Sequence, residues 1–120
     1  MGRVDRKAGL LMKRIEAVVR REKLTDVKLA LAEVSHRSLT ACDSTEQDPL
    51  GGTPVRYRGN SSICDMTPRV SISVLVDDVD ANVAVEAIVR AASTGRGGDG
   101  TVVVVPVEQV VQVSGAEAVA

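Results

Sequence analysis

The chain has 120 residues, which suffices for one small domain with a single hydrophobic core. Its 15 basic and 16 acidic residues give a net charge of −1, so no strong field draws the chain to nucleic acid or to an anionic membrane. Phe and Trp are absent and Tyr57 is the only aromatic residue, which removes the stacking surface that binders of single-stranded nucleic acid use. We therefore expect no nucleic-acid partner.

The sequence also indicates that the chain neither spans a membrane nor is exported. Its longest apolar run, residues 102–107, contains a proline and falls far short of the roughly 20 residues of a membrane-spanning helix. Residues 1–5 lack the apolar stretch of a secretory signal. We expect a cytoplasmic protein without direct membrane insertion, in which Cys42 and Cys64 are reduced. A disulfide that closes the segment between them is the alternative.

The first third of the chain predicts a flexible start, a strand and a helix. Residues 1–11 form the predicted N-terminal extension. Residues 13–19 alternate apolar and polar side chains, as a half-buried strand does. From Leu24 the apolar residues follow a helical spacing, and we expect this helix to end near His36. The helix dipole favours a histidine at that end, so we interpret His36 as a helix-end residue and not as a ligand.

The middle of the chain predicts a short strand followed by a long irregular segment. Residues 38–44 form the predicted strand. Residues 45–68 are too rich in proline and glycine for regular structure and are expected to form a loop or hairpin with Tyr57 packed at its base. A segment of this length without regular structure is uncommon in a compact domain and usually carries function or disorder.

The second half of the chain repeats the order of the first. Residues 69–76 alternate as a half-buried strand. Asp80 is the expected N-cap of a second helix, and Gly95 is expected to stop it. Three segments complete the chain: a strand at 101–105, a last short strand at 107–113 and a loose tail at 116–120.

This order of elements predicts an α+β fold of the ferredoxin-like type, a βαββαβ sandwich with both helices on one face of a four-stranded sheet. The opposite face is expected to carry Val, Ala and Ile side chains, which self-association would cover. The RNA-recognition fold shares this order but needs aromatic side chains on its open face, and this chain lacks them.

The most informative local sequence is the glycine-rich segment 94–100, between the second helix and the strand that follows. Its glycines permit positive φ angles and a close backbone approach, so successive N–H groups can cradle an anion, to which Arg96 would add positive charge. The segment follows a helix and precedes a strand, so it is neither a P-loop nor a dinucleotide-binding motif. A plain connecting turn is the alternative interpretation.

Several stretches of the sequence resemble the PII nitrogen-regulatory signal proteins. Residues 94–100 (TGRGGDG), followed by a Val-rich strand and residues 106–111 (PVEQVV), resemble the C-terminal signature of that family. Residues 12–19 (MKRIEAVV) resemble its first strand and residues 24–34 (LTDVKLALAEV) its first helix. The sequence Tyr-Arg-Gly at 57–59 resembles part of its long loop.

The resemblance implies one PII-like domain over residues 12–115, assembled as a homotrimer whose sheets enclose a central core. It implies a flexible T-loop at about residues 45–68 that contacts a regulated transporter or enzyme. It also implies nucleotide binding in the clefts between subunits. The regulated process would belong to nitrogen metabolism or, as in divergent PII-like proteins that accompany carboxysomes and bicarbonate transport, to inorganic-carbon metabolism. Bicarbonate is then a second candidate ligand.

Several positions depart from the pattern that the resemblance implies. The tyrosine that many bacterial members uridylylate falls at Ser62, and the T-loop glutamine that helps to hold Mg-ATP and 2-oxoglutarate falls at Leu50. The lysine that closes the glycine signature falls at Thr101, and two phosphate-binding arginines fall at Gln112 and Ser114. A charged hydrogen bond contributes about 1.5–3 kcal/mol, so three lost phosphate contacts weaken ATP binding by several powers of ten. We therefore expect ADP or AMP to be favoured over ATP, with an atypical mode of ATP binding as an alternative.

The resemblance leaves a reduced set of candidate nucleotide contacts, some of them from the neighbouring subunit. Arg69, where the family has lysine, is the strongest candidate for an anion contact, with a surface ion pair as its alternative. No catalytic motif and no set of metal ligands is found, so we expect a regulator that is not an enzyme and requires no cofactor. A trimeric docking module that binds no ligand is the other alternative. The candidate contacts are Gly98, Asp99, Gly100, Thr101, Arg69, Leu39, Thr40, Ser73, Leu75 and Arg96, with Arg56 and Arg58 as anion contacts from the T-loop.

Overall fold

The computed structural model describes residues 11–47, 53–57, 60–64 and 66–114, and between residues 53 and 66 it describes the backbone alone. In this part of the chain an antiparallel four-stranded sheet has the order β2-β5-β1-β6. Its strands are β1 (Met12–Val19), β2 (Leu39–Gln47), β5 (Met66–Asp77) and β6 (Gly100–Val107).

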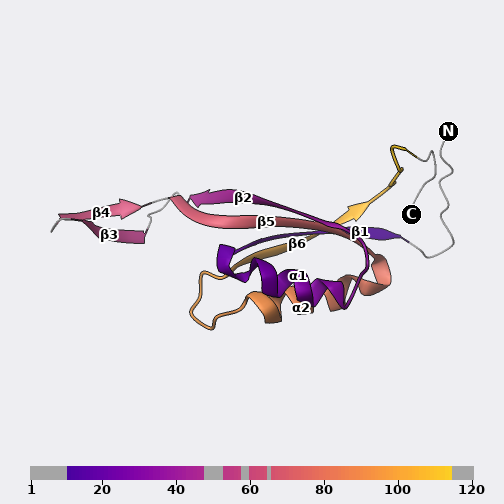
Figure 1. The fold of residues 1–120 in the computed structure, drawn as a ribbon, viewed down its shortest axis with the longest axis horizontal. Helices are drawn as coiled ribbons and strands as arrows, with labels where there is room; N and C mark the ends of the chain where they lie inside the picture. The colour runs from indigo at the N-terminus through magenta and orange to yellow at the C-terminus, as the bar shows by residue number, and fades with distance from the viewer. Residues whose placement is uncertain (1–10, 48–52, 58–59, 65, 115–120) are drawn as a thin grey trace.

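Helices α1 (Leu24–Ala32) and α2 (Ala81–Ala92) pack side by side on one face of this sheet (Figure 1). Each helix follows a short 3-10 turn, Arg21–Lys23 before α1 and Asp78–Asp80 before α2. The chain order and the sheet order together are those of the predicted ferredoxin-like fold, which is confirmed.

The hydrophobic core lies between the sheet and the helices. On β1 and β5 the buried side chains alternate along the strand, as the period-two sequence pattern predicts, and they meet the apolar sides of α1 and α2. Ile15 of β1 and Ile88 of α2 are both fully buried. The other large buried side chains of this layer are Val19, Val27, Leu31, Val70, Ile72, Val74 and Val76.

Strands β3 (Thr53–Tyr57) and β4 (Asn60–Cys64) form a hairpin that projects from the end of the sheet where β2 stops and β5 begins (Figure 1). β2 and β5 stay paired as far as Gln47 and Met66. Regular structure therefore enters the predicted irregular segment from both sides, and the hairpin alternative is the one observed. Pro54 is tolerated in β3 because a strand of a two-stranded ribbon has a free edge. Gly51, Gly52 and Gly59 lie outside the described residues.

Three details of the predicted helix ends are wrong. α2 ends at Ala92, before Gly95, because Ser93 already has an extended backbone. α1 ends at Ala32, where the N–H of Val34 bonds to the carbonyl of Leu31 at 3.0 Å and tightens the last turn. His36 is therefore an exposed loop residue beyond the helix. Asp80 makes no side-chain capping bond, because it already belongs to a 3-10 turn and has helical backbone angles.

The C-terminal strands also differ from the prediction. β6 runs without interruption from Gly100 through Pro106 to Val107, and only Val111, in an isolated bridge, represents the strand predicted at 107–113. Pro106 fits within β6 because β6 is an edge strand, on which a missing N–H donor need not break the ladder.

The face of the sheet turned away from the helices, which we call the open face, is more polar than predicted. Arg14 and Glu16 of β1 point to it and form an ion pair at 3.0 Å. Their neighbours on the same face include Ser73 of β5 as well as Val103 and Val105 of β6. The open face is thus a mixture of aliphatic and paired charged side chains.

Candidate functional site

The glycine-rich loop connects the end of α2 to the start of β6 and has an unusual backbone. Gly95, Gly97, Gly98 and Gly100 all have positive φ angles, between 66° and 124°. At Gly100 a side chain is also excluded by space, because a Cβ there would lie 1.9 Å from the carbonyl oxygen of Val18. The prediction that these glycines permit positive φ angles is confirmed.

The carboxylate of Asp99 holds this loop in shape from inside. The Thr94 backbone N–H donates to Asp99 Oδ2 at 2.9 Å, and the Thr94 hydroxyl donates to Oδ1 at 2.6 Å. Arg20 Nε donates to the same Oδ1 at 3.1 Å. The Thr94 hydrogen bonds, followed by Arg20, hold the pKa of Asp99 well below its usual range. Asp99 is therefore a charged residue that organises the loop with its side chain.

Two arginines engage the loop carbonyls from the sheet side. Arg20 Nη2 donates to the Gly97 carbonyl at 3.0 Å, and Arg69 Nη2 donates to the Gly98 carbonyl at 2.7 Å. Among the hydrogen bonds of the described residues, none uses the N–H of Gly97 or Gly98. The loop carbonyls are therefore already hydrogen-bonded, whereas the N–H groups of Gly97 and Gly98 are available to a ligand oxyanion.

Arg69 is buried, with 6% of its surface exposed. The alternative prediction, in which Arg69 forms an ion pair on the surface, placed it in a more exposed position. Its Nε lies 3.4 Å from Glu46 Oε1, and its backbone carbonyl accepts a hydrogen bond from Arg21 Nε at 3.2 Å. Arg21 Nε in turn lies 3.5 Å from Asp43 Oδ1. Three arginines and three carboxylates therefore surround the junction between the glycine loop and the stem of the hairpin.

Of the other predicted contacts, Leu39 and Thr40 lie on β2, the edge strand opposite β6, whereas Ser73 and Leu75 lie on the inner strand β5. Thr40 of β2 pairs with Ser73 of β5 on the open face, which Leu75 shares, whereas Leu39 points to the helix side. β2 and β6 are the two edge strands, so three strand spacings, about 14 Å, separate Thr40 from the row of Thr101. One chain therefore keeps Leu39 and Thr40 apart from the glycine loop.

Comparison with known proteins settles the family. The model of the family "Nitrogen regulatory protein P-II" matches residues 12–117. A nitrogen regulatory protein P-II of Azospirillum brasilense is 41% identical over 102 residues, which cover 85% of this chain and 91% of that protein. The chain belongs to the nitrogen regulatory protein P-II family.

A second P-II relative agrees with this assignment, and a solved structure shares the fold. A P-II protein of Rhizobium meliloti is 38% identical over 102 residues, covering 85% of this chain and 91% of that protein. The crystal structure of Arabidopsis thaliana PII bound to citrate superimposes with a TM-score of 0.71 at 24% identity and covers 91% of this chain and 89% of that one. The resemblance stated from the sequence is confirmed, and the P-II relatives are named as regulatory proteins.

Several residues of the candidate P-II site are exposed or are not fully described. Arg96 lies exposed in the loop, and Thr101 is exposed at the start of β6. Arg58 lies outside the described residues, and of Arg56 only the backbone in β3 is described. Gln112 and Ser114 are both exposed beyond β6.

The sequence analysis missed Arg20, which contacts both Asp99 and Gly97. The signal that could have found it is strand register. Val19 pairs with Gly100, so the residue after β1 must lie beside the residue before β6. Arg20 and Asp99 are 79 positions apart in the chain, so their contact can be inferred only when the pairing of β1 with β6 is known.

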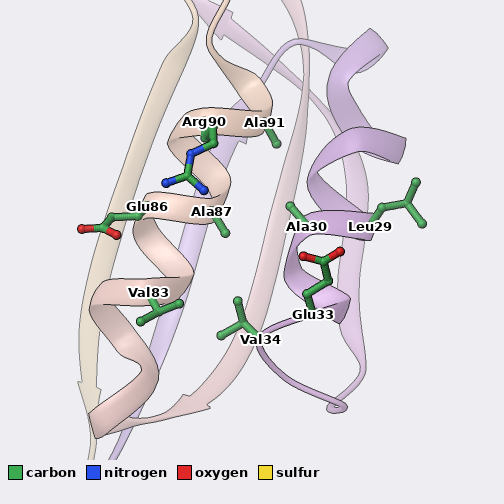
Figure 2. A pocket seen from close by; sticks show the side chains of 9 residues that line it. All are labelled: Leu29, Ala30, Glu33, Val34, Val83, Glu86, Ala87, Arg90 and Ala91. Carbon is green, nitrogen blue, oxygen red and sulfur yellow. The ribbon is translucent and has the colours of Figure 1, made fainter.

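Among the surface hollows of the described residues, a small one borders the glycine loop and a larger one lies elsewhere. One of about 190 Å³ lies beside Asp99, Gly100 and Thr101, against the end of α2. A larger one of about 470 Å³ lies between α1 and α2, where Leu29, Val34 and Val83 line it together with charged residues (Figure 2). No predicted contact lines the larger hollow.

Among the described residues, no group of three or more His, Cys, Asp or Glu side chains is placed to hold a metal ion. Within the same residues, no helix is long and apolar enough to cross a membrane. Cys42 is exposed on β2, and the side chain of Cys64 is not described.

Proposed function

We propose that this P-II chain is a trimeric regulator that binds an adenine nucleotide in the clefts between its subunits and controls a partner through its T-loop. The observation that carries the proposal is the glycine loop, whose N–H groups at Gly97 and Gly98 lack partners among the described residues while Arg20 and Arg69 fix its carbonyls. Such a loop is pre-organised to bind the oxyanions of a phosphate chain.

The split of the candidate contacts supports a site shared between subunits. The glycine loop leads into edge strand β6, whereas Thr40 lies on the opposite edge strand β2. A second copy that places its β2 edge beside this loop would complete the site from both sides. Closed homotrimers bring unlike edges of neighbouring copies together in this way.

The charges at the site favour a nucleotide with few phosphates, so we infer a preference for ADP or AMP over ATP. Arg20 already donates to Asp99 and to the Gly97 carbonyl, and Arg69 already donates to the Gly98 carbonyl. Thr101, Gln112 and Ser114 carry no charge. Each phosphate oxygen left without a charged donor forgoes about 1.5–3 kcal/mol.

The projecting hairpin supports the proposal that the T-loop meets a partner. β2 and β5 continue past the body of the sheet, and β3 and β4 extend beyond their ends (Figure 1). A regulated transporter or enzyme of nitrogen metabolism is the partner class that the names of the relatives favour. Inorganic-carbon metabolism, with bicarbonate as a second ligand, is the alternative.

Calorimetric titration of the full chain with ATP, ADP and AMP tests the proposal, each with and without bicarbonate. We expect binding of ADP or AMP that is tighter than binding of ATP, at one site per subunit. Light scattering on the same sample is expected to give the mass of a trimer. Heat from none of the nucleotides would reject the sensor function in favour of a ligand-independent docking module.

A further inference from the structure

Arg69 is a buried cation whose hydrogen bonding is incomplete. Its side chain is 7% exposed, and its Nη2 is satisfied by the Gly98 carbonyl. Its Nε has no hydrogen-bond partner among the described residues, and neither has the buried hydroxyl of Ser44, the residue directly opposite on β2. Buried polar groups are nearly always paired in folded proteins, so these two neighbouring donors indicate a position that an oxygen of a ligand can fill.

The only carboxylate recorded beside that Nε, within the described residues, is the side chain of Glu46. Its Oε1 lies 3.4 Å from Arg69 Nε, close enough for an ion pair, yet the contact does not meet the geometry of a hydrogen bond. Ser44 is opposite Arg69 and Glu46 is opposite Thr67, so Glu46 and Arg69 are diagonal neighbours on one face of the two strands.

The two partners of this ion pair differ in their freedom to leave it. The Glu46 side chain is 46% exposed, so it can turn into water at little cost, as carboxylates of exposed ion pairs do. Arg69 is buried and tied to Gly98, so its charge stays in place and needs a counter-charge whenever Glu46 leaves.

We propose that Glu46 is a built-in competitor of the ligand: its carboxylate neutralises Arg69 in the free chain, and an oxyanion of the ligand replaces it in the complex. The inference rests on the function proposed above and adds the means of regulation. Glu46 is the second-last residue of β2, at the paired stem of the T-loop, so its displacement loosens that stem. By linkage, Glu46 and the ligand oxyanion weaken one another equally.

Substitution of Glu46 by glutamine, with Asp43→Asn as the matched control, tests this competition. Both substitutions remove one negative charge from β2 beside the arginine cluster, but Asp43 pairs with Arg21 and not with Arg69. We expect Glu46→Gln to tighten ADP binding about three- to fivefold, the upper part of the range of an exposed ion pair, and Asp43→Asn to change it by less than half as much. Equal effects of the two substitutions would show a general charge effect and overturn the inference.

A second measurement separates the inference from the proposed function. The Nε–H resonance of Arg69 is followed by NMR in the wild-type chain and in Glu46→Gln, without nucleotide, during titration with inorganic phosphate and with bicarbonate. We expect whichever anion shifts the resonance to have a lower midpoint in Glu46→Gln. Equal midpoints, or no shift with either anion in both proteins, overturn the inference even if ADP binds. A lower midpoint without any nucleotide binding supports the inference and rejects the nucleotide-sensing function.

Discussion

Gly100 and Val18 approach so closely that the first residue of β6 must be glycine. A Cβ at position 100 would lie 1.9 Å from the Val18 carbonyl oxygen, and the φ angle of +124° is itself unfavourable for other residues. The approach fixes where the glycine loop joins the sheet, since Gly100 pairs with Val19 in the β1–β6 ladder. The loop conformation and the sheet register therefore depend on the same residue.

We expect Gly100→Ala to destabilise the chain by ~3 kcal/mol or more, because backbone must move to admit the methyl group. Gly95→Ala is the control, since φ is +77° there but nothing lies within 4 Å of the added Cβ. It should cost only the ~1–2 kcal/mol of the left-handed conformation. Urea unfolding followed by circular dichroism, at one fixed protein concentration, measures both. Similar losses for the two variants would contradict the close approach.

The Asp99 carboxylate is expected to make stability depend on acid pH. Its pKa is lowered in the folded chain by Thr94 and Arg20, so the unfolded chain binds more protons than the folded chain as the pH falls below the ordinary aspartate value of about 3.9. The stabilisation is complete above that value and is lost as the pH falls toward the lowered pKa. Asp99→Asn should therefore destabilise the chain at pH 7, and the difference from the wild type should shrink below about pH 4. A difference that stays constant from pH 7 to pH 3 would contradict this role.

Much of the fold could be predicted because its signals are local. The alternation of Ile15, Ala17 and Val19 shows the buried face of β1, and the same pattern on β5 was equally clear. The path of β6 through Pro106 could not be predicted, because only the order of strands shows that β6 is at the edge. The end of α1 before His36 depends on hydrogen bonds in its last turn, which the apolar spacing does not encode.

The candidate site also has a part that could be predicted from the sequence and a part that could not. The glycine loop could be predicted from composition, since its positive φ angles need glycine. The contacts of Arg20 with Asp99 and of Arg69 with Gly98 join residues 79 and 29 positions apart, and they follow only from strand register and side-chain reach. For the same reason the sequence alone does not indicate a role for Glu46. Its relation to Arg69 exists only once β2 and β5 are paired.

Substitution by alanine is expected to destabilise the chain strongly at Ile88 of α2 and only slightly at Val89. Ile88 is 0% exposed, whereas Val89 is 52% exposed on the same helix. Ile88→Ala leaves a cavity and should cost about 2–5 kcal/mol. Val89→Ala removes a mostly hydrated side chain and should change stability by about 0.5 kcal/mol or less. Equal unfolding midpoints of the two variants in urea would show that α2 packs on the sheet through another face.

Arg69 is expected to contribute directly to nucleotide affinity. Arg69→Ala removes both the counter-charge for an oxyanion and the bond to the Gly98 carbonyl, and it should weaken ADP binding at least about tenfold. Arg69→Lys keeps the charge but not the planar fork, so it should retain an intermediate affinity. Arg37→Ala, which breaks an ion pair with Asp77 away from the loop, is the control. Calorimetry on folded variants decides, and an unchanged affinity in Arg69→Ala would remove this residue from the site.

Trimer formation through the open face is expected to depend on Val103 and not on Val83. The two valines are nearly equally exposed, at 52% and 53%, but Val103 lies on the open face of β6, whereas Val83 lines the hollow between α1 and α2 (Figure 2). In an assembled core, an arginine at position 103 would be buried beside the Arg14–Glu16 ion pairs. Its charge would have no carboxylate partner there, and burying an unpaired charge is strongly unfavourable. Val103→Arg should therefore give monomers in light scattering at micromolar concentration, while Val83→Arg stays trimeric. Dissociation by Val83→Arg alone would place the subunit interface on the helices, because an added charge disrupts only the face that association buries.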